Sequence, residues 1–275
     1  MAVKSKDLYP AIFSRHAEAY EHRLETAMAR GEAKGRQRLI DLVEARAGMR
    51  ILDLACGPGN LTRRLAALVA PDGVVIGVDL AAGMLERARA AHTPNARFEI
   101  MDIEELRFDD ASFDAATCGH GLQFVPHLDR ALSEARRVLR TGSRFVASVP
   151  APGAGSVMSL LDSVVDRWLP PAPEAYDRDA TRAAVLDPGT FAAAASDAGF
   201  TTVRVETVEE TVKWESAEQL VAMCSSWWLF ASRLEKVEGG RRESFAEDAI
   251  ATIRKEHPGP FETTGSSHIL FAVAP

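Results

Sequence analysis

Short apolar runs alternate with amphipathic helical patterns through the middle of this 275-residue chain. Apolar runs occupy residues 49–55, 74–80 and 113–119, and apolar residues at helical spacing follow the first two runs at 60–70 and 82–92. Runs with so few polar positions are typical of strands that are buried on both faces. The alternation therefore predicts an α/β fold with a doubly wound, mostly parallel sheet.

The flanking regions have a different rhythm and are expected to cover this sheet. Residues 8–46 carry apolar side chains at roughly helical spacing, with breaks expected at Gly31 and Gly35. A stretch rich in Pro and Gly at 150–156 precedes a further helical pattern. We divide the chain into N-terminal covering helices at 1–46, an α/β domain at 47–150 and 187–275, and lid insertions at 151–186 and 216–262.

The second part of the α/β domain begins with a clear helix start. Asp187 can cap the helix, and Pro188 suits its first turn. Alternating residues at 201–214 and an apolar run at 266–275 predict two further strands.

Composition excludes several classes of function. The formal net charge of −7 argues against nucleic acid as the main partner, because phosphate binding relies on clustered Lys and Arg. Cys56, Cys118 and Cys224 lie far apart, which fits a reducing compartment and gives neither a disulfide framework nor a zinc site. No His, Asp and Glu grouping has metal-ligand spacing, and no apolar run has the length of a membrane span. We therefore expect a cytoplasmic protein without metal, nucleic acid or membrane partners.

Acidic residues follow three successive predicted strands. Asp53 precedes a turn that contains Gly57 and Gly59. Asp79 ends the next strand, where a carboxylate can accept both hydroxyls of a ribose. Asp102 ends the third strand, where a carboxylate and its apolar neighbour can bracket an adenine. Helix capping explains any one of these carboxylates, whereas a nucleoside site at the strand ends explains all three.

The glycine turn does not match two other nucleotide sites. A dinucleotide fingerprint requires G-x-G-x-x-G, and here Thr62 stands at the third glycine position. A Walker phosphate loop requires Gly-Lys followed by Ser or Thr, which this turn lacks. The turn is therefore predicted to serve a nucleoside without a pyrophosphate.

The order of these motifs resembles that of class I S-adenosylmethionine-dependent methyltransferases, in particular the branch of ubiquinone/menaquinone-biosynthesis and natural-product enzymes. The resemblance covers residues 51–149 and is carried by LDLACGPGN, VDLAAGMLERAR, MDIEELRFDDASFDAATCGHGLQFVPH and LDRALSEARRVLRTGSRFVASV. More loosely, FSRHAEAYEHR resembles the helix that closes over the cofactor in this branch. The resemblance implies a Rossmann-like, seven-stranded, mostly parallel sheet with an antiparallel last strand, N-terminal covering helices and a helical lid.

The resemblance also implies how S-adenosylmethionine, and S-adenosylhomocysteine as its product, would be held. The methionine part would lie over the glycine turn, the ribose at Asp79, and the adenine at the following strand ends. Ala55 stands where the family often has its first glycine, and alanine is also small. Tyr20 would cover the cofactor, although packing in the core explains it equally well. The implied cofactor residues are Tyr20, Asp53, Ala55, Gly57, Gly59, Asp79, Leu80, Met84, Asp102, Ile103, Cys118 and Gly119.

His120, just after the fourth predicted strand, is our candidate for a catalytic base. A base is needed only if the acceptor loses a proton, and a histidine bonded to backbone or cofactor is the alternative. Aromatic side chains of the lid are expected to make a dry acceptor pocket, unless they form the core of the lid itself. The predicted acceptor-pocket residues are Phe124, Trp168, Trp227 and Trp228.

We thus expect a methyltransferase, monomeric or homodimeric, that acts on a small apolar or aromatic metabolite, with oxygen favoured over nitrogen or carbon. Two alternatives stay open. One is a descendant that binds the cofactor without methylating and instead catalyses a cyclisation or rearrangement, or serves as a scaffold. The other is a macromolecule methyltransferase, which the acidic charge and the aromatic lid disfavour.

Overall fold

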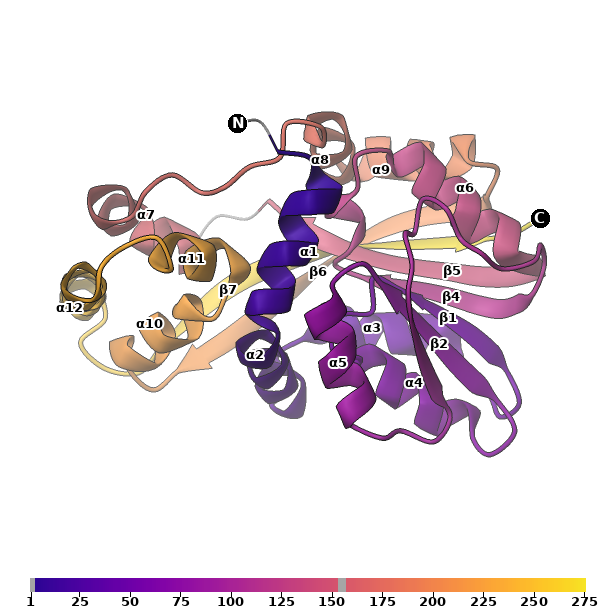
Figure 1. Ribbon diagram of the computed structural model, residues 1–275, viewed down its shortest axis with the longest axis horizontal. Coiled ribbons are helices and arrows are strands. Elements are labelled where there is room, and N and C mark those ends of the chain that lie inside the picture. The colour runs from indigo at the N-terminus through magenta and orange to yellow at the C-terminus, as the bar shows by residue number, and fades with distance from the viewer. Residues whose placement is uncertain (1–2, 153–156) are drawn as a thin grey trace.

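A computed structural model describes residues 3–152 and 157–275 of the chain (Figure 1). Within these residues the strands form one seven-stranded sheet in the order β3-β2-β1-β4-β5-β7-β6. Neighbouring strands are parallel except that β7 runs antiparallel to both β5 and β6. The expected doubly wound sheet with an antiparallel last strand is confirmed. The strands are β1 (Arg50–Leu54), β2 (Val74–Asp79), β3 (Ala96–Ile100), β4 (Phe113–Gly119), β5 (Leu139–Ala151), β6 (Thr201–Trp214) and β7 (Phe261–Val273).

Helices cover both faces of the sheet, because successive strand residues point to opposite sides. Ile51 of β1 packs on the face of α3 and α4, and its neighbour Leu52 packs on the face of α6 and α9. Both side chains are fully buried. These helices and their neighbours are α3 (Lys34–Val43), α4 (Asn60–Val69), α5 (Ala82–Ala90), the 3-10 helix η1 (Leu122–Phe124), α6 (Leu128–Val138), α8 (Asp179–Leu186) and α9 (Pro188–Asp197).

The start of α9 follows the local sequence. Asp187 accepts a hydrogen bond from the backbone N–H of Thr190 at 2.8 Å, and Pro188 occupies the first turn. A capping bond of this kind stabilises a helix by about 1 kcal/mol. None of the helices in the described residues is long and apolar enough to cross a membrane.

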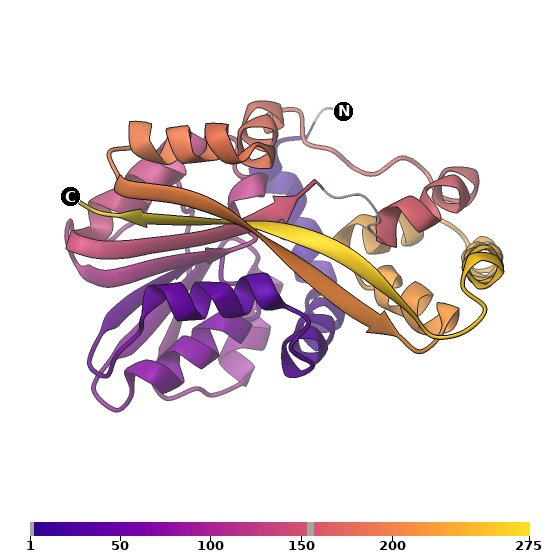
Figure 2. The ribbon, with the colours of Figure 1, turned by 180° about the vertical axis from the view of Figure 1, so that it is seen from behind.

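The antiparallel strands β6 and β7 extend past the sheet as a long twisted ribbon that carries a second, smaller core (Figure 2). We call this part the lid. Phe230 and Phe245 are fully buried in it, and Trp214 of β6 donates a hydrogen bond to Thr263 of β7 at 2.8 Å. The lid helices are α7 (Val157–Trp168), α10 (Ala217–Ser225), α11 (Trp228–Leu234) and α12 (Gly239–Glu256).

The first predicted lid insertion, 151–186, divides between two places in the fold. Its residues 153–156 lie outside the described residues. α7 belongs to the core of the lid, whereas α8 contacts α9 and η1 and buries Val185 in the core of the α/β domain.

The N-terminal helices α1 (Ser5–Arg15) and α2 (Ala17–Ala29) cross the molecule between the lid and the sheet (Figure 1). Gly31 lies with φ +70° in the turn between α2 and α3, as a helix break requires. The break expected at Gly35 was wrong, because this residue lies inside α3. A Cβ at Gly35 would lie 3.0 Å from both Glu210 Oε1 and Ser267 Cβ, so the glycine permits close packing of α3 on the ribbon.

Candidate cofactor and acceptor site

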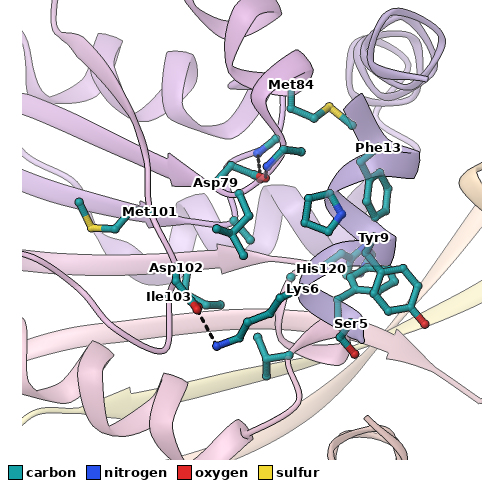
Figure 3. A pocket seen from close by; sticks show the side chains of 18 of the residues that line it. Ser5, Lys6, Tyr9, Phe13, Asp79, Met84, Met101, Asp102, Ile103 and His120 are labelled. Carbon is teal, nitrogen blue, oxygen red and sulfur yellow. Dashed lines mark hydrogen bonds and ion pairs between the residues drawn. The ribbon is translucent and has the colours of Figure 1, made fainter. Parts of the chain in front are cut away.

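A cavity lies at the carboxyl ends of β1, β2 and β4 and beneath α1 (Figure 3). Its empty volume, with the open mouth included, is about 750 Å³. Open α/β sheets bind ligands at this edge. Of the residues implied for the cofactor, those that line the cavity are Tyr20, Ala55, Gly57, Asp79, Leu80, Met84, Asp102, Ile103 and Gly119.

Asp79 ties the glycine turn to the start of α5. Its Oδ2 accepts the backbone N–H of Gly57 and its Oδ1 accepts that of Ala81, both at 2.8 Å. Gly57 has φ +55°, a conformation that glycine adopts without strain. Burial raises the pKa of Asp79 above its ordinary value. The carboxylate is therefore fixed at the cavity wall, where its remaining lone pairs can accept the hydroxyls of a ribose.

Asp53 supports this edge from below and does not line the cavity. The side chain is 1% exposed and accepts hydrogen bonds from the hydroxyls of Thr62 at 2.5 Å and Thr117 at 2.9 Å. Burial raises the pKa of Asp53 to about 6. Thr62, at the position where a dinucleotide site has its third glycine, thus joins α4 to β1.

Gly59 and Cys118 also act behind the cavity wall. Gly59 caps α4 with φ +81°, and a Cβ there would lie 3.0 Å from the ring of Phe98. Cys118 is fully buried, and burial raises the pKa of its thiol to about 12. Neither residue contacts the cavity, so each shapes the strand ends that do.

His120 lies at the cavity with its backbone in the left-handed region, at φ +60°. Its Nε2 is 3.2 Å from Ser267 Oγ of β7. Burial, together with the positive charges of Arg36 and Arg23, lowers the pKa of His120 well below its ordinary value. The ring is therefore neutral at pH 7 and has a nitrogen lone pair for a proton. A strained backbone at such a position is common at functional sites.

The wall opposite the strand ends comes from α1, and most of it had no signal in the sequence. Lys6 Nζ lies 2.5 Å from Asp102 and 2.6 Å from Glu104. Burial lowers the pKa of Lys6, but these two bonds outweigh it and raise that pKa above its ordinary value. Figure 3 shows Lys6 and Phe13 reaching from α1 toward the strand ends. Only Phe13 lies in a motif, FSRHAEAYEHR, that indicated a covering helix.

The predicted acceptor-pocket residues separate in the structure. Phe124 lines the cavity, with its ring centroid 5.3 Å from that of Phe13. Trp228 packs behind it, 5.7 Å from the Phe124 ring. Trp168 donates to Asp248 at 2.7 Å and is not at the cavity, because it packs against the core of the lid. Trp227 lines a different cavity, beside α2.

The cavity fits a nucleoside with an amino-acid tail. Met84 and Ile103 offer apolar surface for a base, and Asp79 offers acceptors for a ribose. Arg36 supplies a cation at the other end: its Nε would lie 4.0 Å from a Cβ on Gly119. A carboxylate beside Gly119 would therefore find a guanidinium. Within the described residues, no group of three His, Cys, Asp or Glu converges as a metal site.

Comparisons with known proteins agree with this geometry. A family model described as "Methyltransferase domain" matches residues 51–142. The demethylmenaquinone methyltransferase of Symbiobacterium thermophilum is 39% identical over 140 residues, which are 49% of this chain and 56% of that protein. A ubiquinone/menaquinone biosynthesis C-methyltransferase of Ectopseudomonas mendocina is 34% identical over 175 residues, 58% of this chain and 68% of that protein. The chain belongs to the class I S-adenosylmethionine-dependent methyltransferase family.

Family membership implies that S-adenosylmethionine is the ligand of the cavity. A solved structure, phosphoethanolamine N-methyltransferase 2 of Haemonchus contortus in complex with S-adenosylhomocysteine, superposes with a TM-score of 0.54. It is 17% identical and covers 88% of this chain and 53% of that one, so it shows the methyltransferase fold alone. The chain covers 56% of the first curated relative, the demethylmenaquinone methyltransferase.

Proposed function

We propose that the protein transfers the methyl group of S-adenosylmethionine to a small apolar or aromatic molecule. The observation that carries the proposal is the cavity that joins Asp79, at the end of β2, to Gly119, at the end of β4, beneath the aromatic side chains of α1. Bound S-adenosylmethionine supplies a methyl group that is activated on a sulfonium. The residues of this chain then have to position the acceptor and keep water out.

Asp79 would hold the ribose, and Arg36 would pair with the methionine carboxylate beside Gly119. Phe13 and Tyr20, whose ring centroids are 5.8 Å apart, cover the cavity and exclude water. Placing the acceptor atom in line with the methyl group supplies roughly 7–11 kcal/mol of barrier lowering. Where the acceptor loses a proton, the neutral ring of His120 takes it.

The atom that receives the methyl group is left open between oxygen and carbon. Oxygen was the expectation from the sequence, whereas the Ectopseudomonas mendocina relative is named as a C-methyltransferase. The experiment that tests the proposal is transfer of a labelled methyl group from S-adenosylmethionine to a panel of phenols, quinols and aromatic acids, followed by mass spectrometry. Label in a product that the Asp79→Ala variant does not form supports the proposal. Retention of all label in S-adenosylmethionine with every class of acceptor contradicts it.

A further inference from the structure

A second cavity lies between α2 and the β6–β7 ribbon, with an empty volume of about 670 Å³ when its open mouth is included. Arg23 of α2 and Trp227, at the start of α11, both line it. Tyr20 links the two cavities: it lines the first one, and the guanidinium carbon of Arg23, a residue that lines the second, lies 5.0 Å from its ring centroid. The charge of Arg23 also acts on His120, which lines the first cavity. The second cavity therefore adjoins the place where the methyl group would be transferred.

Two buried donors in this cavity lack a hydrogen-bond partner among the described residues. They are Nε of Arg23 and Nε1 of Trp227. The guanidinium carbon of Arg23 lies 5.5 Å from the Trp227 ring, so the two donors belong to one wall. Buried polar groups are almost always satisfied, because an unpaired donor forfeits its bonds to water. Because the two residues that carry these donors line the cavity, they are candidates to take acceptor oxygens from outside the chain.

The positive charge of Arg23 has no partner of opposite sign in the described part of the chain. Burial, together with the charge of Arg36, lowers the pKa of Arg23 to about 10. Glu32 and Glu210 line the same cavity, yet neither is among the groups whose charge acts on Arg23. Glu210 Oε1 instead accepts the backbone N–H of Gly35 at 2.6 Å.

The carboxylate of the cofactor would pair with only one of these two arginines. S-adenosylmethionine carries a single carboxylate, and Arg36 stands beside Gly119, where that carboxylate would lie. Arg36 also donates to the hydroxyl of Tyr20 at 3.2 Å, which holds it on the side of the first cavity. Arg23 lies on the far side of Tyr20 and is left for another anion.

We propose that Arg23 and Trp227 form an anchor for a carboxylate on the methyl acceptor. A guanidinium and an indole N–H can both donate to the oxygens of a carboxylate, and arginine binds carboxylates more strongly than neutral oxygens. The rings of Tyr20 and Trp227 flank the guanidinium, so the body of the acceptor next to the carboxylate is aromatic or apolar. This inference rests on the proposed function and names the acceptor class of the same site.

The test is isothermal calorimetry of aromatic carboxylates, from benzoate to 2-naphthoate, against the protein saturated with S-adenosylhomocysteine. The matching amides and phenols serve as probes without a carboxylate. We expect at least one carboxylate to bind tenfold or more tightly than its amide. Arg23→Gln should remove this preference, and Trp227→Phe, which keeps the ring and deletes the N–H, should reduce it about threefold or more. Arg30→Gln, an equal change of charge at the exposed end of the same helix, should leave it unchanged.

Affinity for S-adenosylhomocysteine, measured first for each variant, separates the anchor from the proposed function. If the wild-type protein does not bind S-adenosylhomocysteine, the proposed function itself is contradicted. Wild-type binding of S-adenosylhomocysteine without any preference for carboxylate over amide would overturn the anchor alone. The anchor is also wrong if Arg23→Gln and Arg30→Gln change the preference equally, or if phenols bind as tightly as carboxylates and depend on Arg23 in the same way.

Discussion

Replacing Asp79 with Asn should separate cofactor affinity from folding stability. The carboxylate accepts two backbone N–H groups, from Gly57 and Ala81, at 2.8 Å each. An amide keeps one acceptor oxygen but turns an NH2 donor toward the second N–H and removes the anion that faces the ribose. Hydrogen bonds to charged groups contribute about 1.5–3 kcal/mol each. Loss of one such bond to the ribose therefore weakens binding of S-adenosylhomocysteine roughly 10- to 150-fold.

The effect of this substitution on stability should be smaller than its effect on binding. Burial raises the pKa of Asp79, which means that the folded protein holds the charged form at a cost that a neutral amide does not have. The free energy gained by removing this buried charge offsets part of the free energy that is lost with the hydrogen bond to the glycine turn.

The assay is calorimetric titration with S-adenosylhomocysteine, combined with thermal unfolding of the same samples. Asp72→Asn is the matched control, because this exposed carboxylate lies just before β2, at the opposite end of the strand. Affinity of Asp79→Asn within threefold of the wild-type value, with unchanged affinity in the control, would refute the assignment of Asp79 to the ribose.

Three further predictions concern the residues around the cavity. His120→Asn should lower turnover about 100-fold or more if a proton is removed, with affinity for S-adenosylhomocysteine kept within threefold. Because the pKa of His120 is depressed, wild-type kcat/KM should fall only on the acid side of pH 6.5, and loss of activity above that pH would contradict this role of His120. Gly121→Ala should destabilise the fold by about 1–3 kcal/mol in chemical denaturation, because its Cβ would lie 2.4 Å from that of Ala55. An unchanged unfolding midpoint would show that the backbone around Ala55 and Gly121 moves to accommodate the methyl group, against this prediction. The folded-state pKa of Asp53 is about 6 against an ordinary value of 3.8, so the unfolded chain releases this proton at a lower pH than the folded protein does. The contribution of Asp53 to the free energy of unfolding therefore falls by about 3 kcal/mol as pH rises between these two values. Asp53→Asn should flatten that part of the curve of stability against pH, and an unaltered curve would argue against this role of Asp53.

The sheet and the strand-end residues were predictable because their signals are local. Residues such as Ile51 and Leu52 make the strands apolar on both faces, and parallel strands bring their carboxyl ends to one edge whatever the rest of the chain does. The positions of Asp79 and Asp102 at the cavity follow from that rule.

The part of the cavity wall that α1 contributes, and the positions of Trp168 and Trp227 in the fold, were not predictable in the same way. Lys6 meets Asp102 and Glu104 across nearly a hundred residues, and a lysine in an amphipathic helix has no motif that reports such a partner. Trp168 and Trp227 sit in similar apolar surroundings in the sequence and both pack against the core of the lid, yet only Trp227 also lines a cavity. The packing of the lid against α1 and α2 decides between these outcomes, and that packing is a property of the tertiary structure.

The proposed function requires that the cavity beneath α1 binds S-adenosylmethionine for methyl transfer. Its most direct test is calorimetric titration of the wild-type protein with S-adenosylmethionine and S-adenosylhomocysteine, with adenosine diphosphate as the comparison. We expect saturable binding of both sulfur nucleosides at one site per chain and much weaker binding of the diphosphate. Folded protein that binds neither sulfur nucleoside, or that prefers the diphosphate, would contradict it.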